Sequence, residues 1–143
     1  MSSQAKEIAT KLIKCFKRGN KILICGNGGS AQQANHFAAE LVHEGLPAIS
    51  LTSDISVVTA IANDEGYQFI FANQILALGK KGDILITLST SPLGKSANVW
   101  WAFETARNLD IENIFFPQEG NVARCQEYQL GLIHKIKGIL NDN

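Results

Sequence analysis

Short apolar runs that alternate with stretches of helical periodicity constrain the fold of this chain more than any other feature. Each run is flanked by turn residues, which is typical of strands buried on both faces of a parallel sheet. The expected strands cover residues 21–25, 47–51, 83–88 and 112–116. Helices are expected over residues 3–18, 31–43, 67–78 and 122–140, with about a dozen helical residues after Ser96 and a short helix capped by Asp54.

Strands that alternate with helices are joined by right-handed crossovers, which place helices on both faces of one sheet. The sequence therefore predicts an α/β fold with three layers, in which a flavodoxin-like parallel sheet of four strands lies between helices on both faces. The 143 residues, 45% of them hydrophobic, are enough to bury one core. No linker or repeat divides them, so we expect a single domain over residues 1–143.

Charge and cysteine content exclude several classes of function. Thirteen basic and thirteen acidic residues give zero net charge without a basic block, so we expect no nucleic acid partner. The apolar runs are too short to cross a bilayer, and the first residues lack the apolar stretch of a signal peptide. The three cysteines show no C-x-x-C spacing, which favours buried, reduced thiols. We therefore expect a cytoplasmic protein with no membrane partner.

Two loops that follow expected strands carry chemically unusual residues. Gly26–Ser30 (GNGGS) opens directly onto a helix, and its glycines let backbone N–H groups approach an anionic ligand. The second loop carries the hydroxyls of Ser89, Thr90, Ser91 and Ser96 ahead of another helix. Because ligands of open α/β sheets bind beyond the carboxyl ends of the strands, the two loops together predict a phosphate site. Taken singly, each is also compatible with a tight turn or a helix cap.

A dinucleotide site is the alternative interpretation of the first loop. Gly26, Gly28 and Ala31 fit the relaxed fingerprint G-x-G-x-x-A, and Asp54 follows the second expected strand, where a ribose-binding acid is found. Against this interpretation, the chain is too short for a separate catalytic domain, and the hydroxyls at 89–91 would have no role. We therefore expect no nucleotide cofactor.

Two further helices carry residues suited to acid–base or metal chemistry. His36 and Glu40 are four residues apart, so they share one face of the helix that follows the glycine loop. Gln126 and His134 lie on the closing helix. A His/Glu pair at this spacing is often only a surface ion pair, and a lone helical histidine is often structural. The residues alone leave these alternatives open.

Several segments match one known family together. They are CGNGGSA (25–31), HFAAEL (36–41), LTSD (51–54), TAIAND (59–64), LSTS (88–91), RCQE (124–127) and the pair Ile133–His134. In this combination they resemble the bacterial phosphoheptose isomerases of the sugar-isomerase (SIS) domain superfamily. Non-catalytic relatives resemble the same loops but lack the matching glutamate and second histidine, both of which this chain keeps as Glu40 and His134.

The resemblance implies a SIS fold and an aldose–ketose isomerase that converts sedoheptulose 7-phosphate to D-glycero-D-manno-heptose 7-phosphate, a step toward lipopolysaccharide heptose. It also implies a homotetramer with active sites between subunits and a bound Zn²⁺. Matched position by position, the substrate-binding residues would be Asn27, Gly28, Gly29, Ser30, Asn63, Asp64, Ser89, Thr90, Ser91, Ser96 and Gln126. The Zn²⁺ ligands would be His36, Glu40, Gln126 and His134. Of these, Glu40 is expected to be the base at carbon and His134 its acid–base partner near the oxygens.

The chain departs from the family pattern in four places, one of which is the segment 42–47, where an arginine common in the family is absent. A whole strand is missing between Phe116 and Arg124, Ala123 replaces the usual acid, and the link from Ser91 to Ser96 is longer than usual. These departures favour, as the alternative function, a SIS module that binds a sugar phosphate or a protein without catalysis. The shortened sheet edge also leaves apolar residues that need cover, among them Trp100, Trp101 and Phe103, so we expect self-association.

The positions of Gln126 and His134 limit how they act together. Eight residues of unbroken helix separate them by about 12 Å, and the side chain of Gln126 leans away from His134. Both therefore cannot bind one ion from the same helix. Either the helix starts after Gln126, or the two residues serve one site from different subunits.

Overall fold

Four parallel strands form one sheet in the order β2-β1-β3-β4 in the computed structural model, which describes residues 2–118 and 120–142. The strands are β1 (Ile22–Gly26), β2 (Ala48–Ser50), β3 (Ile84–Leu88) and β4 (Glu112–Phe115). The helices are α1 (Ser2–Lys17), α2 (Gly29–His43), α3 (Ile55–Asp64), α4 (Ala72–Leu78), α5 (Ala97–Asn108) and α6 (Val122–Asn141), with a 3-10 turn η1 (Tyr67–Phe69). The predicted α/β fold with a parallel sheet is confirmed.

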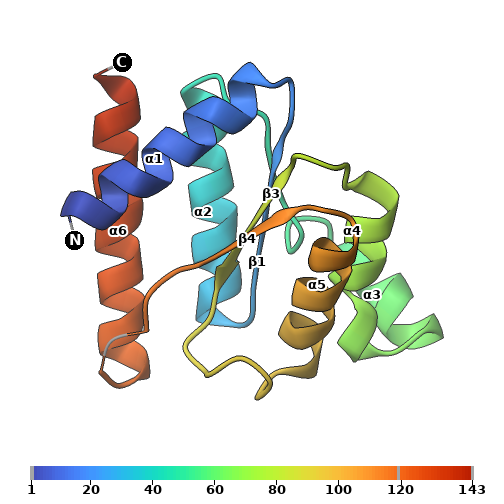
Figure 1. Ribbon diagram of the computed structural model, residues 1–143. Helices are drawn as coiled ribbons and strands as arrows, with labels where there is room; N and C mark the ends of the chain where they lie inside the picture. The colour runs from blue at the N-terminus through green and yellow to red at the C-terminus, as the bar shows by residue number, and fades with distance from the viewer. Residues whose placement is uncertain (1, 119, 143) are drawn as a thin grey trace.

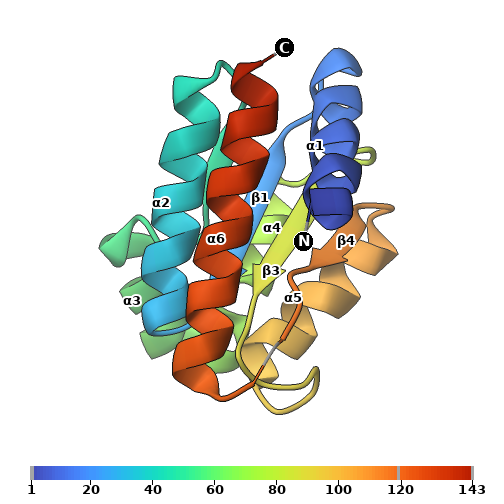
Figure 2. The same cartoon turned by 90° about the vertical axis from the view of Figure 1, so that its left-hand side faces the viewer.

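Helices cover both faces of the sheet, as Figure 1 shows. Alternate strand residues point to opposite faces, so Ile22 and Ile24 pack with α1, α2 and α6, whereas Leu23 and Cys25 pack on the side of α4 and α5. All five residues of β1 and of β3 are buried, which explains why both sequences are mainly apolar, with Thr87 as a buried polar residue in β3. Figure 2 looks onto the layer of α1, α2 and α6, where α2 and α6 run side by side.

One predicted helix is wrong in its extent. The segment 67–78 is not continuous, because the η1 turn ends at Phe69 and α4 starts at Ala72. Between them the chain turns so that Ile70 and Phe71 enter the core, where both are buried. The buried Gln74 amide then donates hydrogen bonds to the carbonyls of Ile70 and Leu51, each at 2.8 Å. Apolar periodicity did not reveal this break.

A buried carboxylate fixes the amino ends of the two central strands. Asp83 Oδ2 pairs with Lys21 Nζ at 2.7 Å, and Asp83 also accepts hydrogen bonds from Asn20 and from backbone N–H groups. Burial alone would raise the pKa of Asp83, but the hydrogen bonds from Lys21, Asn20 and Lys80 outweigh it and hold this pKa below its usual value. The carboxylate thus holds β1 and β3 together ahead of the loops at their opposite ends.

Asp54 caps α3 as expected, since its Oδ1 accepts a hydrogen bond from the Ser56 N–H at 2.9 Å. The three cysteines are buried free thiols, also as expected. Burial raises the pKa of the Cys25 thiol to about 12. Among the described residues, no helix is both long enough and apolar enough to span a membrane.

Candidate active site

The glycine loop and the hydroxyl loop start side by side. β1 lies between β2 and β3, and its last residue Gly26 is in register with Leu88, the last residue of β3. The chain order reverses between β1 and β3, which is where open α/β sheets bind ligands. The predicted juxtaposition of residues 27–30 with residues 89–91 is therefore confirmed.

Glycine is required at two positions of the first loop. A Cβ on Gly26 would lie 2.7 Å from the Leu88 carbonyl oxygen and 2.9 Å from that of Ser30, so no side chain fits there. Gly28 has φ +56 and is the N-cap of α2, without a side-chain capping hydrogen bond. The positive end of the α2 dipole therefore has no side-chain cap, although the Ser30 and Ala31 N–H groups already donate to the Asn27 and Gly28 carbonyls at 2.9 and 3.0 Å.

In the hydroxyl loop, one side chain stabilises the turn and the others remain available to bind a ligand. The Ser89 hydroxyl donates to the Ser91 carbonyl at 2.9 Å and accepts from the Ser91 N–H at 3.1 Å, so it shapes the turn. Ser96 is the N-cap of α5 but makes no side-chain capping bond. Within the described residues, no hydrogen bond engages the hydroxyls of Thr90, Ser91 or Ser96. These three, rather than Ser89, are available to a phosphate.

An asparagine pair that sequence reasoning missed joins the two loops. Asn27 and Asn98 exchange amide hydrogen bonds of 2.9 and 2.8 Å, and the Tyr67 hydroxyl reaches Asn27 Oδ1 at 3.4 Å. Asn98 is only 2% exposed although it lies in the first turn of α5. A polar residue among the buried positions of that helix was the available signal. The pair orients Asn27 beside the glycine loop.

Asn63 and Asp64 are the other predicted substrate-binding residues, and their side chains bond to each other rather than to the loops. They form the exposed end of α3, where the Asn63 amide donates to the Asp64 carboxylate at 2.9 Å. No hydrogen bond connects them to either loop in the described part of the chain. Their role in substrate binding stays a prediction.

Two glutamines of α6 contact the loops directly. The Gln126 amide nitrogen lies 2.5 Å from the place a Cβ on Gly29 would occupy, and the Gln126 carbonyl accepts a hydrogen bond from Gln33 at 2.8 Å. Gln129 is fully buried and donates to the carbonyls of Ser89 (3.0 Å) and Pro117 (3.2 Å). Gln126 thus lies at the glycine loop, as its predicted role in substrate binding requires. Gln129 was missed, although a polar residue on the apolar face of α6 was a visible signal.

His36, Glu40 and His134 come together from α2 and α6. His36 Nε2 lies 3.5 Å from Glu40 Oε1, and the rings of His36 and His134 meet edge to face with centroids 5.7 Å apart. The ammonium group of Lys137 forms an ion pair with the other oxygen of Glu40. Lys137 was not predicted, although it lies one helical turn after His134.

The cations around Glu40 keep its carboxyl group ionised. The hydrogen bond from Lys137 lowers the pKa of Glu40, against the effect of burial, and the charges of Lys137, His36 and His134 lower it further. The same hydrogen bond raises the pKa of Lys137. Glu40 is therefore a carboxylate at neutral pH, the form in which it can accept a proton.

Glu40 lies near the end of α2 that is opposite the loops, whereas His36 lies at the middle of this helix. Glu40 comes eleven residues after Gly29, which places it about 16 Å along the helix. The side chain of Gln126 lies at the loop end, and α6 already starts at Val122, so the alternative in which the helix starts after Gln126 is wrong. Gln126 and His134 of one chain therefore lie at different places, as the alternative of two subunits requires.

The donor types of His36, Glu40 and His134 suit Zn²⁺. The placement of these side chains in one chain does not suit Zn²⁺, because Glu40 is already paired with the Lys137 ammonium and Gln126 is beside Gly29. No three His, Cys, Asp or Glu side chains within residues 2–118 and 120–142 surround a common metal position. Zinc thus stays a prediction, which elemental analysis of the purified protein tests, and no reaction step below depends on it.

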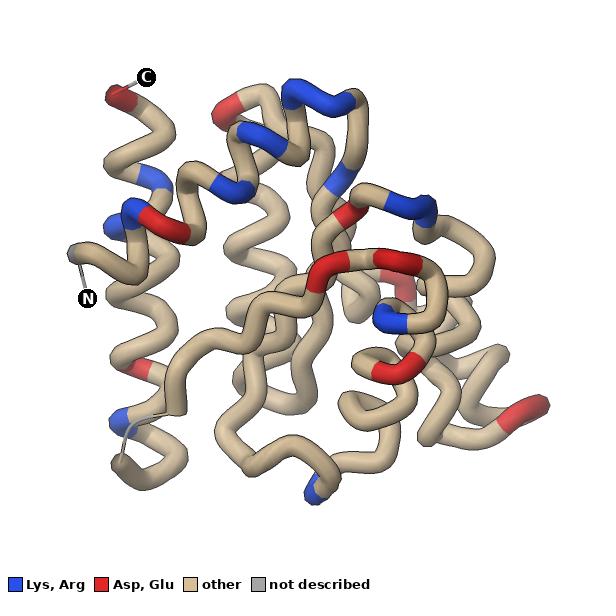
Figure 3. Tube along the Cα trace, viewed as in Figure 1, with Lys and Arg blue, Asp and Glu red and all other residues tan. Residues whose placement is uncertain are grey.

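Charged residues are unevenly distributed along the molecule. Lys and Arg gather on α1 and at the end formed by the amino ends of the strands, whereas the opposite end, where the loops lie, carries few charges (Figure 3). A phosphate bound there would be held mainly by hydroxyls, backbone N–H groups and helix N-termini.

The sequence matches the SIS domain family over residues 2–115. It is 39% identical to the phosphoheptose isomerase of Campylobacter jejuni subsp. jejuni (serotype O:6, strain 81116 / NCTC 11828), over 99% of this chain and 88% of that protein. It is 50% identical to the phosphoheptose isomerase of Roseiflexus sp. (strain RS-1), over 90% and 76% respectively. The Campylobacter alignment spans 166 positions against 143 residues here, so that relative carries residues that this chain lacks.

Solved structures show the same likeness. The phosphoheptose isomerase GmhA of Neisseria gonorrhoeae superposes with a TM-score of 0.87 at 33% identity, covering 99% of this chain and 94% of that one. The phosphoheptose isomerase of Francisella tularensis gives a TM-score of 0.85 at 30% identity, covering 97% and 85%. The chain therefore belongs to the SIS domain family, within its phosphoheptose isomerase group.

Proposed function

We propose that this protein is an aldose–ketose isomerase that converts sedoheptulose 7-phosphate to D-glycero-D-manno-heptose 7-phosphate. The observation that carries the proposal is the cluster of His36, Glu40 and His134, assembled from two helices in a chain whose named relatives are phosphoheptose isomerases. Neutral donors at the two loops suit the phosphate of such a substrate.

The reaction moves a proton between C1 and C2 through an enediol, so it needs a base at carbon and a proton carrier at the oxygens. Glu40 is held as a carboxylate, and it would take the proton from carbon. The neighbouring imidazole of His134 would exchange protons with the substrate oxygens. Phosphate binding at the loops would supply binding energy far from the reacting carbons.

The backbone positions of Gly29 and Glu40 are separated by eleven helical rises, about 16 Å. On α6, Gln126 lies at the loop end whereas His134 lies beside His36, so the predicted site residues of one subunit are not gathered in one place. We therefore infer that the loops of one subunit and the Glu40 cluster of another build each active site, in a homotetramer as the resemblance implies. Exposed aromatic side chains of Trp100 and Trp101, 39% and 42% accessible, support self-association. Buried free thiols support a cytoplasmic location.

Incubation with sedoheptulose 7-phosphate, followed by detection of an aldose phosphate, tests the activity. Thermal shifts measured with the sugar phosphate and with NADH distinguish the alternatives. A shift with the sugar phosphate but no product would favour a binding module without catalysis. A shift with NADH alone would support the dinucleotide interpretation instead.

A further inference from the structure

The outer edge of β4 has unpaired backbone groups. The N–H group of Glu112 donates to the carbonyl of Asp83, just before β3, and that of Phe116 donates to the carbonyl of Thr87 in β3, both at 3.1 Å. Because bonding directions alternate along a strand, the N–H and C=O groups of Asn113 and Phe115 point away from β3. β4 is the last strand of the sheet, so these groups face outward at its edge.

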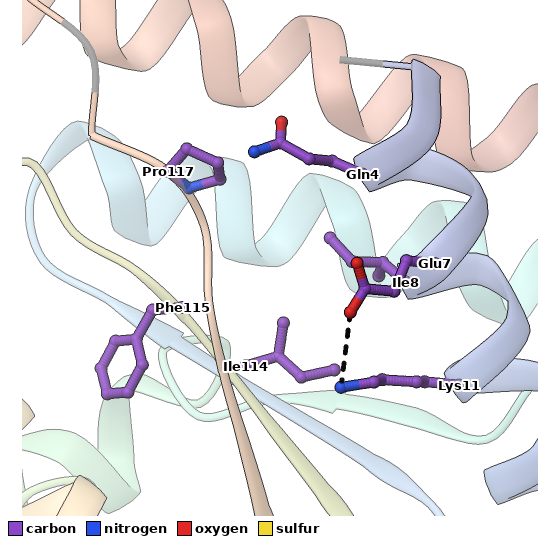
Figure 4. Close-up of a pocket in the computed structure, with 7 residues that line it drawn as sticks. All are labelled: Gln4, Glu7, Ile8, Lys11, Ile114, Phe115 and Pro117. Carbon is purple, nitrogen blue, oxygen red and sulfur yellow. Dashed lines mark ion pairs between the residues drawn. The ribbon is translucent and has the colours of Figure 1, made fainter.

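A groove of about 180 Å³ lies along this edge, between β4 and α1. Figure 4 shows Ile114 pointing toward Ile8 and Lys11 of α1, on one face of the sheet. The lysine is neutralised, because its Nζ lies 2.7 Å from the Glu112 carboxylate. The strand itself contains neither lysine nor proline, the residues that commonly protect exposed edges.

The opposite face of the edge is lined by aromatic rings. Phe115 packs against Phe103, and Phe103 against Trp100, each pair with ring centroids 5.7 Å apart. Phe115 is 40% exposed and Trp100 39%, so the row is only partly covered by its own chain. An apolar strip therefore runs beside the unpaired backbone groups.

We propose that the β4 edge binds the β4 edge of a second copy of this chain, antiparallel and with Ile114 on the two-fold axis. In that register Asn113 of each copy faces Phe115 of the other, and the two pairs exchange four backbone hydrogen bonds. The Phe103–Phe115 rows of the two copies become continuous across the axis and cover each other. Glu112 faces Phe116 of the other copy, so like charges do not oppose each other along the strands. Two-fold pairing closes this contact after two copies, which a parallel arrangement would not, and leaves the other faces free to join such pairs into the homotetramer proposed above.

Replacement of Phe115 by proline tests the proposal without breaking the β3–β4 ladder, because the N–H of Phe115 points outward. Sedimentation should show association of the wild type at protein concentrations of about 1–100 µM, which cover the dissociation constants of weak dimers. Phe115→Pro should weaken it at least tenfold, whereas the control Phe115→Leu, which keeps the N–H, should change it little. Melting curves establish that both variants fold. A wild type that is monomeric at the highest concentration overturns the proposal.

Cross-linking tests the register. Asn113→Cys and Phe115→Cys should form a disulfide-linked dimer when mixed, because hydrogen-bonded pairs place Cα atoms about 5.5 Å apart. Neither variant should cross-link alone, since identical positions lie two residues apart along the pair. The native thiols are buried and do not interfere. Association that survives Phe115→Pro without mixed cross-linking would mean that another face holds the copies together, and this would overturn the proposal.

Discussion

The contacts that surround Glu40 come partly from its own helix and partly from α6. The spacing of His36 and Glu40 was readable in the sequence because it stays within one helix. The contact between Glu40 and Lys137 could not be predicted from the sequence. It depends on α6 packing alongside α2 in the same direction, with the turn that carries Lys137 next to the turn that carries Glu40. His134 was noted as a candidate on the closing helix, but its role beside Glu40 was assigned only through the family resemblance. Local periodicity carries no information on which turns of two distant helices face each other.

Replacing Glu40 by glutamine should lower kcat at least 100-fold while leaving the fold intact. Glutamine keeps the size and hydrogen bonding of the side chain but cannot accept the proton from carbon, and general-base catalysis contributes about 10²–10⁴-fold. Glu104→Gln is a matched control, because Glu104 is also an ion-paired carboxylate, 2.9 Å from Arg107. Turnover and melting temperature are measured for both. A folded Glu40→Gln protein with wild-type turnover would refute the role of Glu40 as base.

Replacing Lys137 by methionine should move the acidic limb of the kcat/KM profile to higher pH. Lys137 lowers the pKa of Glu40, and without it burial is less opposed, so the pKa of Glu40 rises. The base is active only when deprotonated, and activity is therefore lost at a higher pH than in the wild type. Lys137→Arg keeps the positive charge and should keep the wild-type limb. An unmoved limb in the methionine variant would mean that Glu40 does not control it.

At the scale of elements, the strands and the two loops were predictable because strand ends are marked by abrupt changes from apolar to glycine or hydroxyl residues. Which hydroxyls of the second loop stabilise the turn and which remain free could not be predicted. Ser89 uses its hydroxyl to bond Ser91, which depends on the backbone path of the turn. The buried Asn98 was overlooked for a related reason: its partner Asn27 is 71 residues away in the sequence.

The free hydroxyls of the loop should bind the substrate phosphate. Thr90→Val combined with Ser96→Ala should raise KM for the phosphosugar tenfold or more, because each hydrogen bond to a charged group contributes about 1.5–3 kcal/mol. Neither hydroxyl supports the turn or caps α5, so stability should change little. Ser53→Ala removes a hydroxyl that bonds the Ser50 carbonyl outside the loops and serves as the control. Steady-state kinetics that leave KM unchanged would exclude this loop from phosphate binding.

At the scale of the whole molecule, the sequence predicted the layers of the fold but not the separation of its functional parts. The resemblance implied active sites between subunits, but the sequence alone did not show how far Glu40 lies from the loops of its own subunit. The unbroken helix α2 places Glu40 about three turns from Gly29. The neighbouring helix α6 separates its two site residues in a similar way: Gln126 lies beside the start of α2, and His134 lies farther along, beside His36. Two parallel helices thus carry the acid–base cluster away from the loops of their own subunit.

Mixing two defective variants should therefore restore activity. Glu40→Gln disables the cluster in every subunit, and Thr90→Val with Ser96→Ala weakens the loop in every subunit. If each active site combines the loop of one subunit with Glu40 of another, mixed oligomers contain some sites with neither defect. Subunits are exchanged by co-expression, and turnover is measured at a substrate concentration far below KM, where the loop variant keeps about a tenth of the wild-type rate or less and the Glu40→Gln variant about a hundredth or less. A control mixture of the parents without subunit exchange should show only this residual turnover. Co-expressed oligomers, shown by mass spectrometry to contain both variants, that have no more activity than this control would place the loops and Glu40 in the same subunit's site and contradict the shared active site.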